Sequence, residues 1–317
     1  MVRNWTRRKF CFLLAGAGFG LTLSSAEENV PAWPFKLGVI TDELTQDFAQ
    51  ALAFISSHSL ACCELRELWG KNIMNLPLED LNRAKQIVER HRLQVSDIAS
   101  PLFKYNLPEM PAKPEQRDTF LANFTDRDTE DLLARSMKLA RFFGTNKVRI
   151  FSYARVEEPE KAYPHVRDRL ARAAKLAARD QIILVLENEH TCNIGTGKEL
   201  GHLLRDIHSP YLRGTWDPAN AAMLGENPYP DGYQRVRDLF AHMHVKDIKK
   251  DVTTGKLSWA PIGGGFIDYR GQFKALVRDR YSGTVSLETH YRRPDGNALE
   301  STRESLEGLL KVLREIA

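Results

Sequence analysis

The chain contains few cysteines, and none of them has the spacing of a metal-binding cluster. Of its 317 residues only four are cysteine, at positions 11, 62, 63 and 192. Cys62 and Cys63 are neighbours in a strand-like stretch, where adjacent side chains point to opposite faces. We therefore expect small, buried, free thiols in place of a disulfide framework. The spacing also excludes the common cysteine-based zinc motifs.

The net positive charge of the chain disappears once its first 26 residues are set aside. The formal net charge is +4, and residues 1–26 carry four basic residues and no acidic one, so the net charge of residues 27–317 is zero. A nucleic-acid-binding protein needs a basic surface to neutralise phosphates. The composition therefore gives no support to a nucleic-acid partner.

Beyond the first 26 residues there is no long hydrophobic run, and those 26 residues have the composition of a leader. A basic segment is followed by the apolar stretch 12–23 and by Ser24-Ser25-Ala26. This order predicts a signal peptide with a small-residue cleavage site. Arg7 and Arg8 favour the twin-arginine type. A Sec signal or a short membrane anchor is the alternative, although the apolar stretch is short for a bilayer.

This leader predicts export to the periplasm or another exported location. The twin-arginine export machinery would be a partner of the precursor, and no stable membrane insertion is expected after cleavage. The predicted folded part is residues 27–317.

Residues 27–317 alternate between short apolar runs and amphipathic segments. Examples of the latter are His165–Arg179 and Leu299–Ile316. The eight apolar runs are Phe35–Thr41, Leu60–Arg66, Leu93–Ser100, Lys147–Tyr153, Ile182–Asn188, Leu212–Asp217, His242–Asp247 and Thr284–His290. Such alternation predicts a parallel sheet covered by helices. A single-domain α/β fold, the (β/α)8 TIM barrel, is the first expectation. An open doubly wound sheet is the alternative, but no GxGxxG follows the first run.

Polar residues that suit a metal ion stand at the ends of four of these runs. They are Glu187, Asp217, His244 and Glu288, separated by 30, 27 and 44 residues. The carboxyl ends of barrel strands meet at one mouth, where barrel enzymes place their chemistry. Three carboxylates and one imidazole form a hard divalent-metal site. Unrelated ion pairs at the strand ends are the alternative.

Other polar residues near these ends are candidates for contacting a substrate. Lys246 either reaches a substrate oxygen or neutralises Asp247, and Arg66 either contacts substrate or pairs with Glu64. Gly263–Gly265 is interpreted as a turn in preference to a phosphate cradle. The candidates for substrate binding are Arg66, Lys104 in the long Pro-containing segment 101–127, His190, Lys246 and His290.

The order of these motifs resembles the xylose isomerase-like barrel superfamily, in its sugar phosphate isomerase/epimerase branch. The resemblance covers roughly residues 35–316 and is carried by LEN (186–188), WDPAN (216–220), HMHVKD (242–247) and SLETH (286–290). It implies one divalent ion held by the four strand-end residues, first of all Mn²⁺, with Mg²⁺, Co²⁺ and Zn²⁺ as alternatives. It also implies that Glu187 and Glu288 exchange protons with the substrate.

The chain departs from that pattern at Asn220, where many epimerases and endonuclease IV have histidine. Asn220 joins the candidate substrate-binding residues. The extra ligands of a three-zinc nuclease are also missing from the sequence after HVKD, which favours one metal.

The function expected is a metal-dependent isomerase or epimerase of a sugar or sugar derivative, in carbohydrate metabolism. It would remove a proton beside a carbonyl and pass through an enediolate. Two alternatives stay open: a lyase or deglycosidase that uses the same first step for β-elimination on a keto-sugar glycoside, and a non-catalytic sugar-binding barrel.

Overall fold

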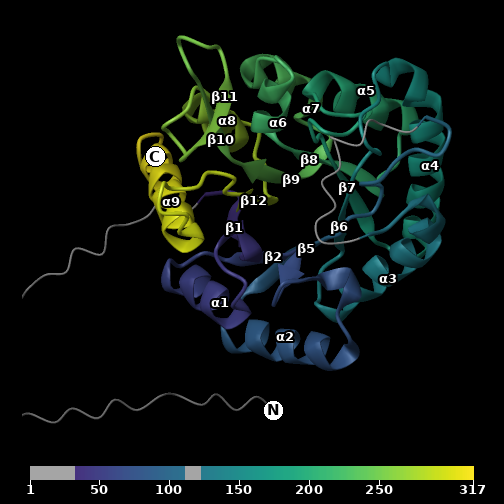
Figure 1. Cartoon of the computed structure of the whole chain (residues 1–317), viewed down its shortest axis with the longest axis horizontal. Coiled ribbons are helices and arrows are strands. Elements are labelled where there is room, and N and C mark those ends of the chain that lie inside the picture. Colours follow the sequence, from purple (N-terminus) through teal and green to yellow (C-terminus); the bar gives the residue numbers. More distant parts are fainter. Residues whose placement is uncertain (1–32, 111–122) are drawn as a thin grey trace, which may run out of the picture. The chain divides into compact units, whose positions relative to one another are not determined.

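In the computed structural model, which describes residues 33–110 and 123–317, eight parallel strands close into a barrel. Neighbours around the barrel follow the order β1-β12-β9-β8-β7-β6-β5-β2, and Figure 1 looks into its centre. The strands are β1 (Lys36–Ile40), β2 (Cys62–Leu65), β5 (Gln94–Ala99), β6 (Lys147–Ile150), β7 (Ile183–Glu187), β8 (Leu212–Trp216), β9 (Phe240–Val245) and β12 (Thr284–Leu287). Seven of them lie inside a predicted run, and β9 begins two residues before the run His242–Asp247, so the barrel prediction is confirmed.

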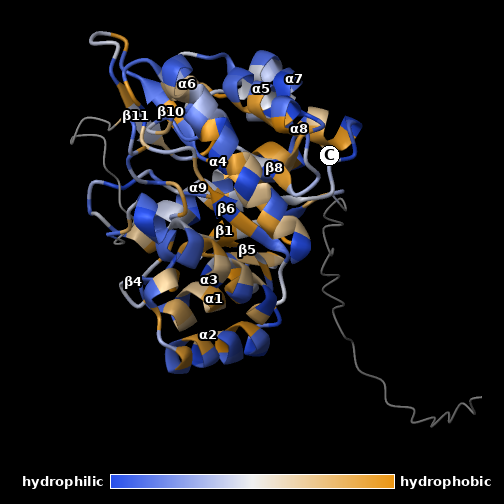
Figure 2. Ribbon diagram, turned by 90° about the vertical axis from the view of Figure 1, so that its right-hand side faces the viewer, coloured by the Kyte–Doolittle hydropathy of each residue, from blue (hydrophilic) through white to orange (hydrophobic). Residues whose placement is uncertain are grey.

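Helices surround the barrel, as the alternation of the sequence predicts (Figure 1). They are α1 (Phe48–Ser57), α2 (Leu78–Arg90), α3 (Thr129–Phe142), α4 (Pro159–Arg179), α5 (Gly197–Ile207), α6 (Pro218–Met223), α7 (Tyr233–Val236), α8 (Tyr269–Arg278) and α9 (Ala298–Arg314). Figure 2 shows that the outer helices carry both hydrophilic and hydrophobic residues. The helix α4 begins six residues before the predicted segment because Pro159 occupies its first turn, where a missing N–H costs nothing.

The two faces of the barrel strands differ in chemistry. Alternate residues such as Leu184 and Leu186 join the continuous apolar core between strands and helices. The residues between them face inward, and several are polar and fully buried, including Glu64, Arg149 and His242. Since a buried charge is costly without partners, these side chains contact one another across the barrel. The interior therefore carries a charged network that leads to the carboxyl ends of the strands.

A hairpin follows β9 and stands beside the barrel mouth. Its strands are β10 (Asp247–Lys250) and β11 (Leu257–Ala260), paired antiparallel, and Figure 1 shows it projecting at the edge of the barrel. The carboxylate of Asp247 accepts hydrogen bonds from the backbone of Gly263 and Gly265, each at 3.0 Å. A Cβ on Gly265 would lie 2.1 Å from that carboxylate. The glycine segment is thus a turn wrapped around Asp247, as the sequence predicts.

The remaining elements are short. A second small hairpin pairs β3 (Glu67–Leu68) with β4 (Lys71–Asn72), and single helical turns include η1 (Thr41–Glu43), η2 (Ile73–Asn75), η4 (Asp126–Asp128) and η5 (Pro228–Gly232). None of the described helices has the length and apolar character needed to cross a membrane. Cys62, Cys63 and Cys192 are free and buried, as predicted. The predicted leader 1–26 lies outside the described residues.

Candidate metal centre and active site

Four predicted ligands converge at one mouth of the barrel. One ligand atom from each of Glu187, Asp217, His244 and Glu288 lies within 4.8 Å of the others, and all four residues are buried. The strands that carry them, β7, β8, β9 and β12, are consecutive neighbours in the barrel. Because these strands are parallel and in register, with Ser286 beside His244, their carboxyl ends meet at one level.

The donor set fits a divalent cation. Three carboxylates and one imidazole are oxygen and nitrogen ligands of the type that Mn²⁺, Mg²⁺ or Zn²⁺ accepts. Asp217 Oδ2 supports the fit, because it is buried and accepts no hydrogen bond among the described residues, although the ammonium group of Lys246 lies 2.8 Å away. Two further metal-capable groups among the described residues, Glu64–His242–His244 and Glu43–Glu288–His290, share a residue with the first. One central ion is the simplest arrangement of these ligands.

Lys246 balances the charge of the carboxylates. Its Nζ lies 2.8 Å from Asp217 Oδ2 and 3.9 Å from Glu187 Oε1, and it donates a short hydrogen bond to Glu288 Oε2. Sequence reasoning left open a pairing with Asp247, but Asp247 is occupied by the glycine turn. Lys246 points into the mouth because it alternates with His242 and His244 along β9. It can therefore donate a proton or hydrogen bond to an oxygen placed at the centre.

The buried carboxylates differ in acidity. Burial by itself raises the pKa of Glu288, but the charges of Lys246, His290 and His244 outweigh it and hold that pKa well below its ordinary value. Burial dominates at Asp217 and raises its pKa, although Lys246 opposes the shift. Pairs of groups whose surroundings drive their pKa values apart mark acid–base chemistry. Glu288 is the carboxylate whose ionised form the site favours more strongly.

His244 is held from both sides. Its Nδ1 faces the carboxylates, 3.3 Å from Glu187 Oε1 and 3.4 Å from Glu288 Oε2. Its Nε2 faces Glu64 Oε2 at 3.1 Å, and that carboxylate also lies 3.0 Å from His242 Nε2. A proton on Nε2 that is donated to Glu64 leaves the Nδ1 lone pair directed at the centre. Carboxylates that hold a ligating histidine in this way raise its basicity and fix its tautomer.

Removing the Glu64 carboxylate is expected to weaken metal binding by about 10–100-fold. Glu64→Leu removes both acceptors, and Glu64→Gln keeps the shape in case the leucine variant does not fold. Affinity for Mn²⁺ would be measured by calorimetric titration, with Glu89→Gln on the exposed side of α2 as the control. Unchanged affinity in a folded Glu64→Leu protein would show that His244 needs no such support.

The predicted substrate-binding residues all lie around this centre, in two groups. Asn220 Nδ2 donates to Glu187 Oε1 at 3.2 Å, and its Oδ1 lies 2.9 Å from His190 Nδ1. Lys104 Nζ lies 3.9 Å from Glu189 Oε2, which also meets Asn220. These residues form the side of the mouth next to β7 and β8. The long segment after β5 thus places the positively charged side chain of Lys104 beside the site.

The other side of the mouth is built around Arg66. Its guanidinium pairs with Glu288 Oε1 at 3.0 Å and with Asp42 and Glu43 of η1 at 2.7 Å. It therefore holds Glu288 in place, whereas Glu64, the partner considered from the sequence, faces His242 and His244. His290 Nε2 lies 3.4 Å from Glu288 Oε1. The His290 side chain is 31% exposed and that of Arg66 only 7%, so His290 is the more accessible of these two neighbours of Glu288.

Several residues of the site were missed by sequence reasoning. Arg149, fully buried, lies 3.5 Å from Glu187 Oε2 and 3.7 Å from Glu64 Oε1. A signal existed, since Arg149 interrupts the apolar run KVRIFS at an inward position. Glu189 was also overlooked, although it alternates with Glu187. Trp259 could not be placed at the mouth from the sequence, because its ring is brought beside His190 and His290 by the β10–β11 hairpin.

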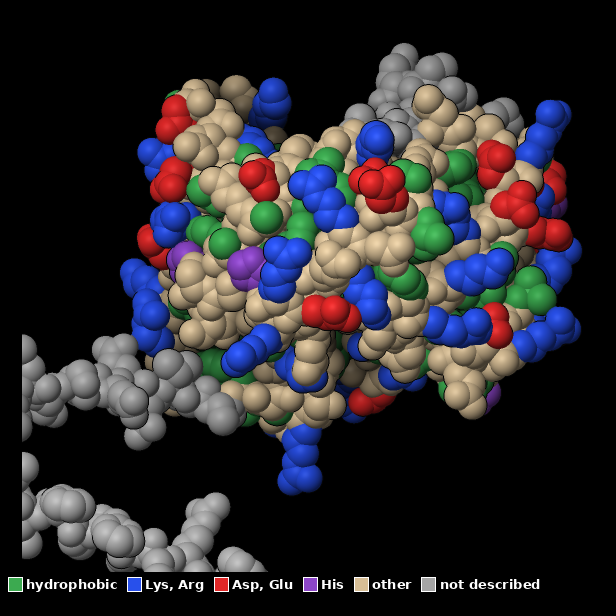
Figure 3. All heavy atoms as spheres, turned by 90° about the horizontal axis from the view of Figure 1, so that it is seen from below, with side chains coloured by type: hydrophobic (Ala, Val, Ile, Leu, Met, Phe, Trp, Pro, Cys, Tyr) green, Lys and Arg blue, Asp and Glu red, His purple; other side chains and the backbone are tan. Residues whose placement is uncertain are grey.

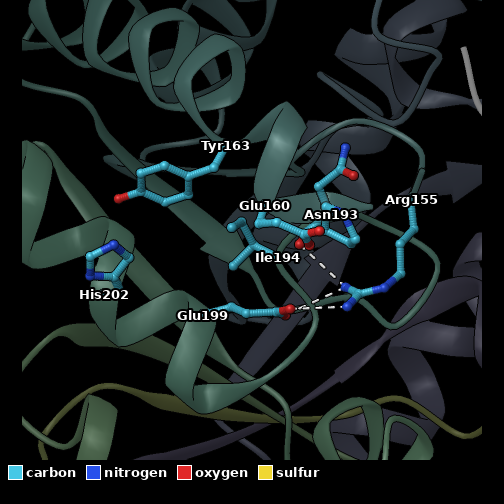
Figure 4. A pocket seen from close by; sticks show the side chains of 8 residues that line it. Arg155, Glu160, Tyr163, Asn193, Ile194, Glu199 and His202 are labelled. Atoms are coloured by element: carbon cyan, nitrogen blue, oxygen red, sulfur yellow. Dashed lines mark hydrogen bonds and ion pairs between the residues drawn. The ribbon is translucent and has the colours of Figure 1, made fainter. Parts of the chain in front are cut away.

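Surfaces outside the mouth offer less chemistry. A pocket of about 340 Å³ is lined by the loops after β6 and β7 and by the first turns of α4 and α5. In this pocket Arg155 pairs with Glu199 (Figure 4), with Nη2 2.9 Å from Oε1. None of the predicted site residues lines this pocket. On the face shown in Figure 3, acidic and basic side chains are intermixed.

Comparison with known proteins agrees with this geometry. A curated relative is the Escherichia coli (strain K12) protein named "Putative L-ribulose-5-phosphate 3-epimerase SgbU", 26% identical over 162 residues, which are 50% of this chain and 56% of the relative. The matched part thus spans little more than half of that relative's length.

Solved structures share the fold over nearly their whole length. The "probable 3-DHS dehydratase AsbF involved in the petrobactin synthesis" from Bacillus anthracis has a TM-score of 0.67 at 18% identity, covering 87% of this chain and 98% of its own. A xylose isomerase-like TIM barrel protein from Mycobacterium smegmatis in complex with magnesium has a TM-score of 0.60 at 18% identity, covering 89% and 98%.

A family model decides the assignment. The model described as "Xylose isomerase-like TIM barrel" matches residues 52–314, which include all four predicted metal ligands. With the closed barrel and the strand-end site already in place, we conclude that this chain belongs to the xylose isomerase-like TIM barrel family.

Proposed function

We propose that the protein is a divalent-metal-dependent isomerase or epimerase of a sugar or sugar derivative. The observation that carries the proposal is the convergence of Glu187, Asp217, His244 and Glu288 within 4.8 Å at the barrel mouth. Relatives of the chain are enzymes, among them a protein named as a sugar phosphate epimerase and one named as a dehydratase. A site with these ligands suits proton removal beside a carbonyl.

The chain's own groups divide the reaction between them. When bound, the ion, with Mn²⁺ preferred over Mg²⁺, Co²⁺ or Zn²⁺, would stabilise negative charge on the substrate oxygens. Glu187 and Glu288 come from strands on opposite sides of β8 and β9, so each can reach a different face of a sugar. One carboxylate removes a proton from the carbon and keeps it, and the other group, in its protonated form, delivers its own proton to the enediolate from the other face. Lys246 supplies a hydrogen bond to a substrate oxygen, while Arg66 and Arg149 fix the two carboxylates.

A second enzymatic function shares the first step. If a leaving group stands β to the carbonyl, the same carbanion expels it, and the enzyme is a lyase or deglycosidase of a keto-sugar glycoside. The fold shared with a protein named as a dehydratase, an enzyme of elimination, is the observation that favours keeping this alternative. The alternative that is not an enzyme is a barrel that binds a sugar without converting it.

Deuterium exchange tests the proposal at the shared step. The Mn²⁺-loaded protein is incubated in D2O with a panel of keto-sugars and keto-glycosides, and proton NMR follows the carbon beside the carbonyl. Exchange together with a new epimer or isomer is expected. Exchange with release of an aglycone would show that the protein is a lyase or deglycosidase and not an isomerase. Binding of a sugar without any exchange would leave only the sugar-binding barrel.

We also propose that the precursor is exported through the twin-arginine machinery, on the sequence of residues 1–26. Replacing both Arg7 and Arg8 by Lys is expected to retain the precursor in the cytoplasm, because the machinery reads the arginine pair. Cell fractionation and immunoblotting measure this, with Arg3→Lys as the matched control. Normal export of the double variant would overturn the twin-arginine assignment.

A further inference from the structure

An indole ring lies beside the polar residues of the site. Trp259 lies on β11, opposite Ile248 of β10, and its ring is half-buried. Its ring centroid lies 4.7 Å from that of His290 and 6.3 Å from that of His190. Lys246 Nζ, which contacts Asp217 and Glu288, lies 5.8 Å from the same centroid. An aromatic surface therefore lies next to the lysine and the histidine that contact Glu288.

The position of this ring is fixed by the fold around it. The hairpin that carries Trp259 starts at Asp247, directly after Lys246, so its first strand is continuous with the metal-site strand. Asp247 also accepts hydrogen bonds from Ile248 and from the glycine turn that follows β11. Both ends of the hairpin are thus tied to one carboxylate. A rigid aromatic surface loses little entropy when a ligand packs on it.

The surroundings of the ring suit a carbohydrate. Trp259, His190 and His290 form what we name the aromatic wall, and the side chains of the two histidines are 25% and 31% exposed. An indole face is large and apolar and carries a negative quadrupole, which attracts the weakly positive C–H groups of a sugar ring. The two imidazoles and Lys246 offer hydrogen-bond partners to hydroxyl groups at the edge. Apolar contact with polar groups at its border is how small-molecule sites orient their ligands.

We propose that the aromatic wall recognises the closed ring of a pyranose, so that the substrate is a pyranose or pyranoside carrying its ketone in the ring. A pyranose presents several C–H groups on one flat face, whereas an open-chain ketose turns its C–H and O–H groups in all directions. This inference rests on the proposed function, since it names the substrate class of the same site. Trp259 is a specificity-determining residue in this proposal and takes no part in proton transfer.

Binding of two ketones of different shape tests the proposal. The probes are methyl 3-keto-β-D-glucopyranoside, which holds a pyranose ring, and L-erythrulose, which is too short to form one. Calorimetry on the Mn²⁺-loaded full chain carrying Glu288→Gln gives dissociation constants without turnover. Trp259→Ala is expected to weaken pyranoside binding by about tenfold or more and to leave L-erythrulose binding unchanged. Trp259→Phe keeps a smaller ring and should weaken pyranoside binding less, and it serves if the alanine variant does not fold.

A matched control is Trp69, a second half-buried tryptophan. Its ring packs on Phe48 and under Arg83, outside the site, so Trp69→Phe should change neither dissociation constant. Pyranoside binding that stays within about twofold in Trp259→Ala, or an equal loss for both probes, would overturn the aromatic wall. If, in addition to such a result, the protein with intact Glu288 catalyses deuterium exchange on L-erythrulose, the aromatic wall alone is overturned and the proposed function stands. If the metal-loaded protein binds neither probe and exchanges no proton, both proposals fall.

Discussion

Glu288→Gln is expected to slow proton exchange at the substrate carbon by about 10²–10⁴-fold, the usual contribution of a positioned general acid or base. A carboxamide cannot accept the proton, although it fills the same volume and still meets Arg66 Nη1. Initial exchange rates in D2O with the best keto-sugar of the panel give the ratio. Glu187→Gln should show a loss of similar order if the two carboxylates serve opposite faces of the sugar.

The control for this experiment is a glutamate of the same chemistry away from the mouth. Glu304 on α9 is partly exposed and pairs with Arg293, so Glu304→Gln should leave exchange unchanged. Metal content must be measured in both site variants, because Glu187 and Glu288 are also proposed ligands. A Glu288→Gln protein that keeps its metal and exchanges at the wild-type rate would remove Glu288 from the proton-transfer pair.

The second large effect concerns the ion itself. Purified protein, residues 27–317, is expected to carry about one divalent ion per chain after incubation with Mn²⁺, and His244→Ala should lose it. The reason is that His244 supplies the only nitrogen among the four buried ligands. Ions that bind the folded state alone also stabilise it, by about 2.7 kcal/mol at a hundredfold excess over the dissociation constant. Inductively coupled plasma mass spectrometry gives the metal content, and thermal unfolding with and without Mn²⁺ gives the stabilisation.

His202 provides the comparison for that variant. It is exposed on α5 and stacks on Tyr163, so His202→Ala should bind metal and gain stability as the unaltered chain does. If the unaltered protein takes up neither Mn²⁺, Co²⁺ nor Zn²⁺ and its unfolding temperature does not respond to them, the central inference fails. The sugar-binding barrel would then be the best account of the fold.

The barrel and the four residues proposed as metal ligands could be predicted from the sequence for one physical reason. Strands buried on both faces appear as short apolar runs, and a charged residue at the end of such a run stands out. Glu187 after IILVL and Glu288 after TVSL are examples. The direction of parallel strands then places all these ends at one mouth, whatever the detailed packing. Residue type and strand position together were sufficient to name the four residues that converge at the mouth.

The closure of the barrel determines which charged side chains pair with one another inside the mouth. Arg66 and Glu288 are 222 residues apart, and they meet because β1 pairs with both β12 and β2. Nothing near Arg66 in the sequence indicates that partner, and its neighbour Glu64 turns instead to the two histidines of β9. Likewise Lys246 meets Asp217 across the mouth and not the adjacent Asp247.

The sequence by itself therefore determined the family of fold, the order of the strands and the four strand-end residues that meet at the mouth, because these depend on local hydrophobic pattern and strand direction. The tertiary structure alone decided which charges neutralise one another and that Trp259 of the β10–β11 hairpin lies beside His190 and His290. Such contacts depend on side-chain directions across a closed barrel, where residues distant in the chain lie within a few ångströms of one another. Each buried charge there needs a partner of opposite charge.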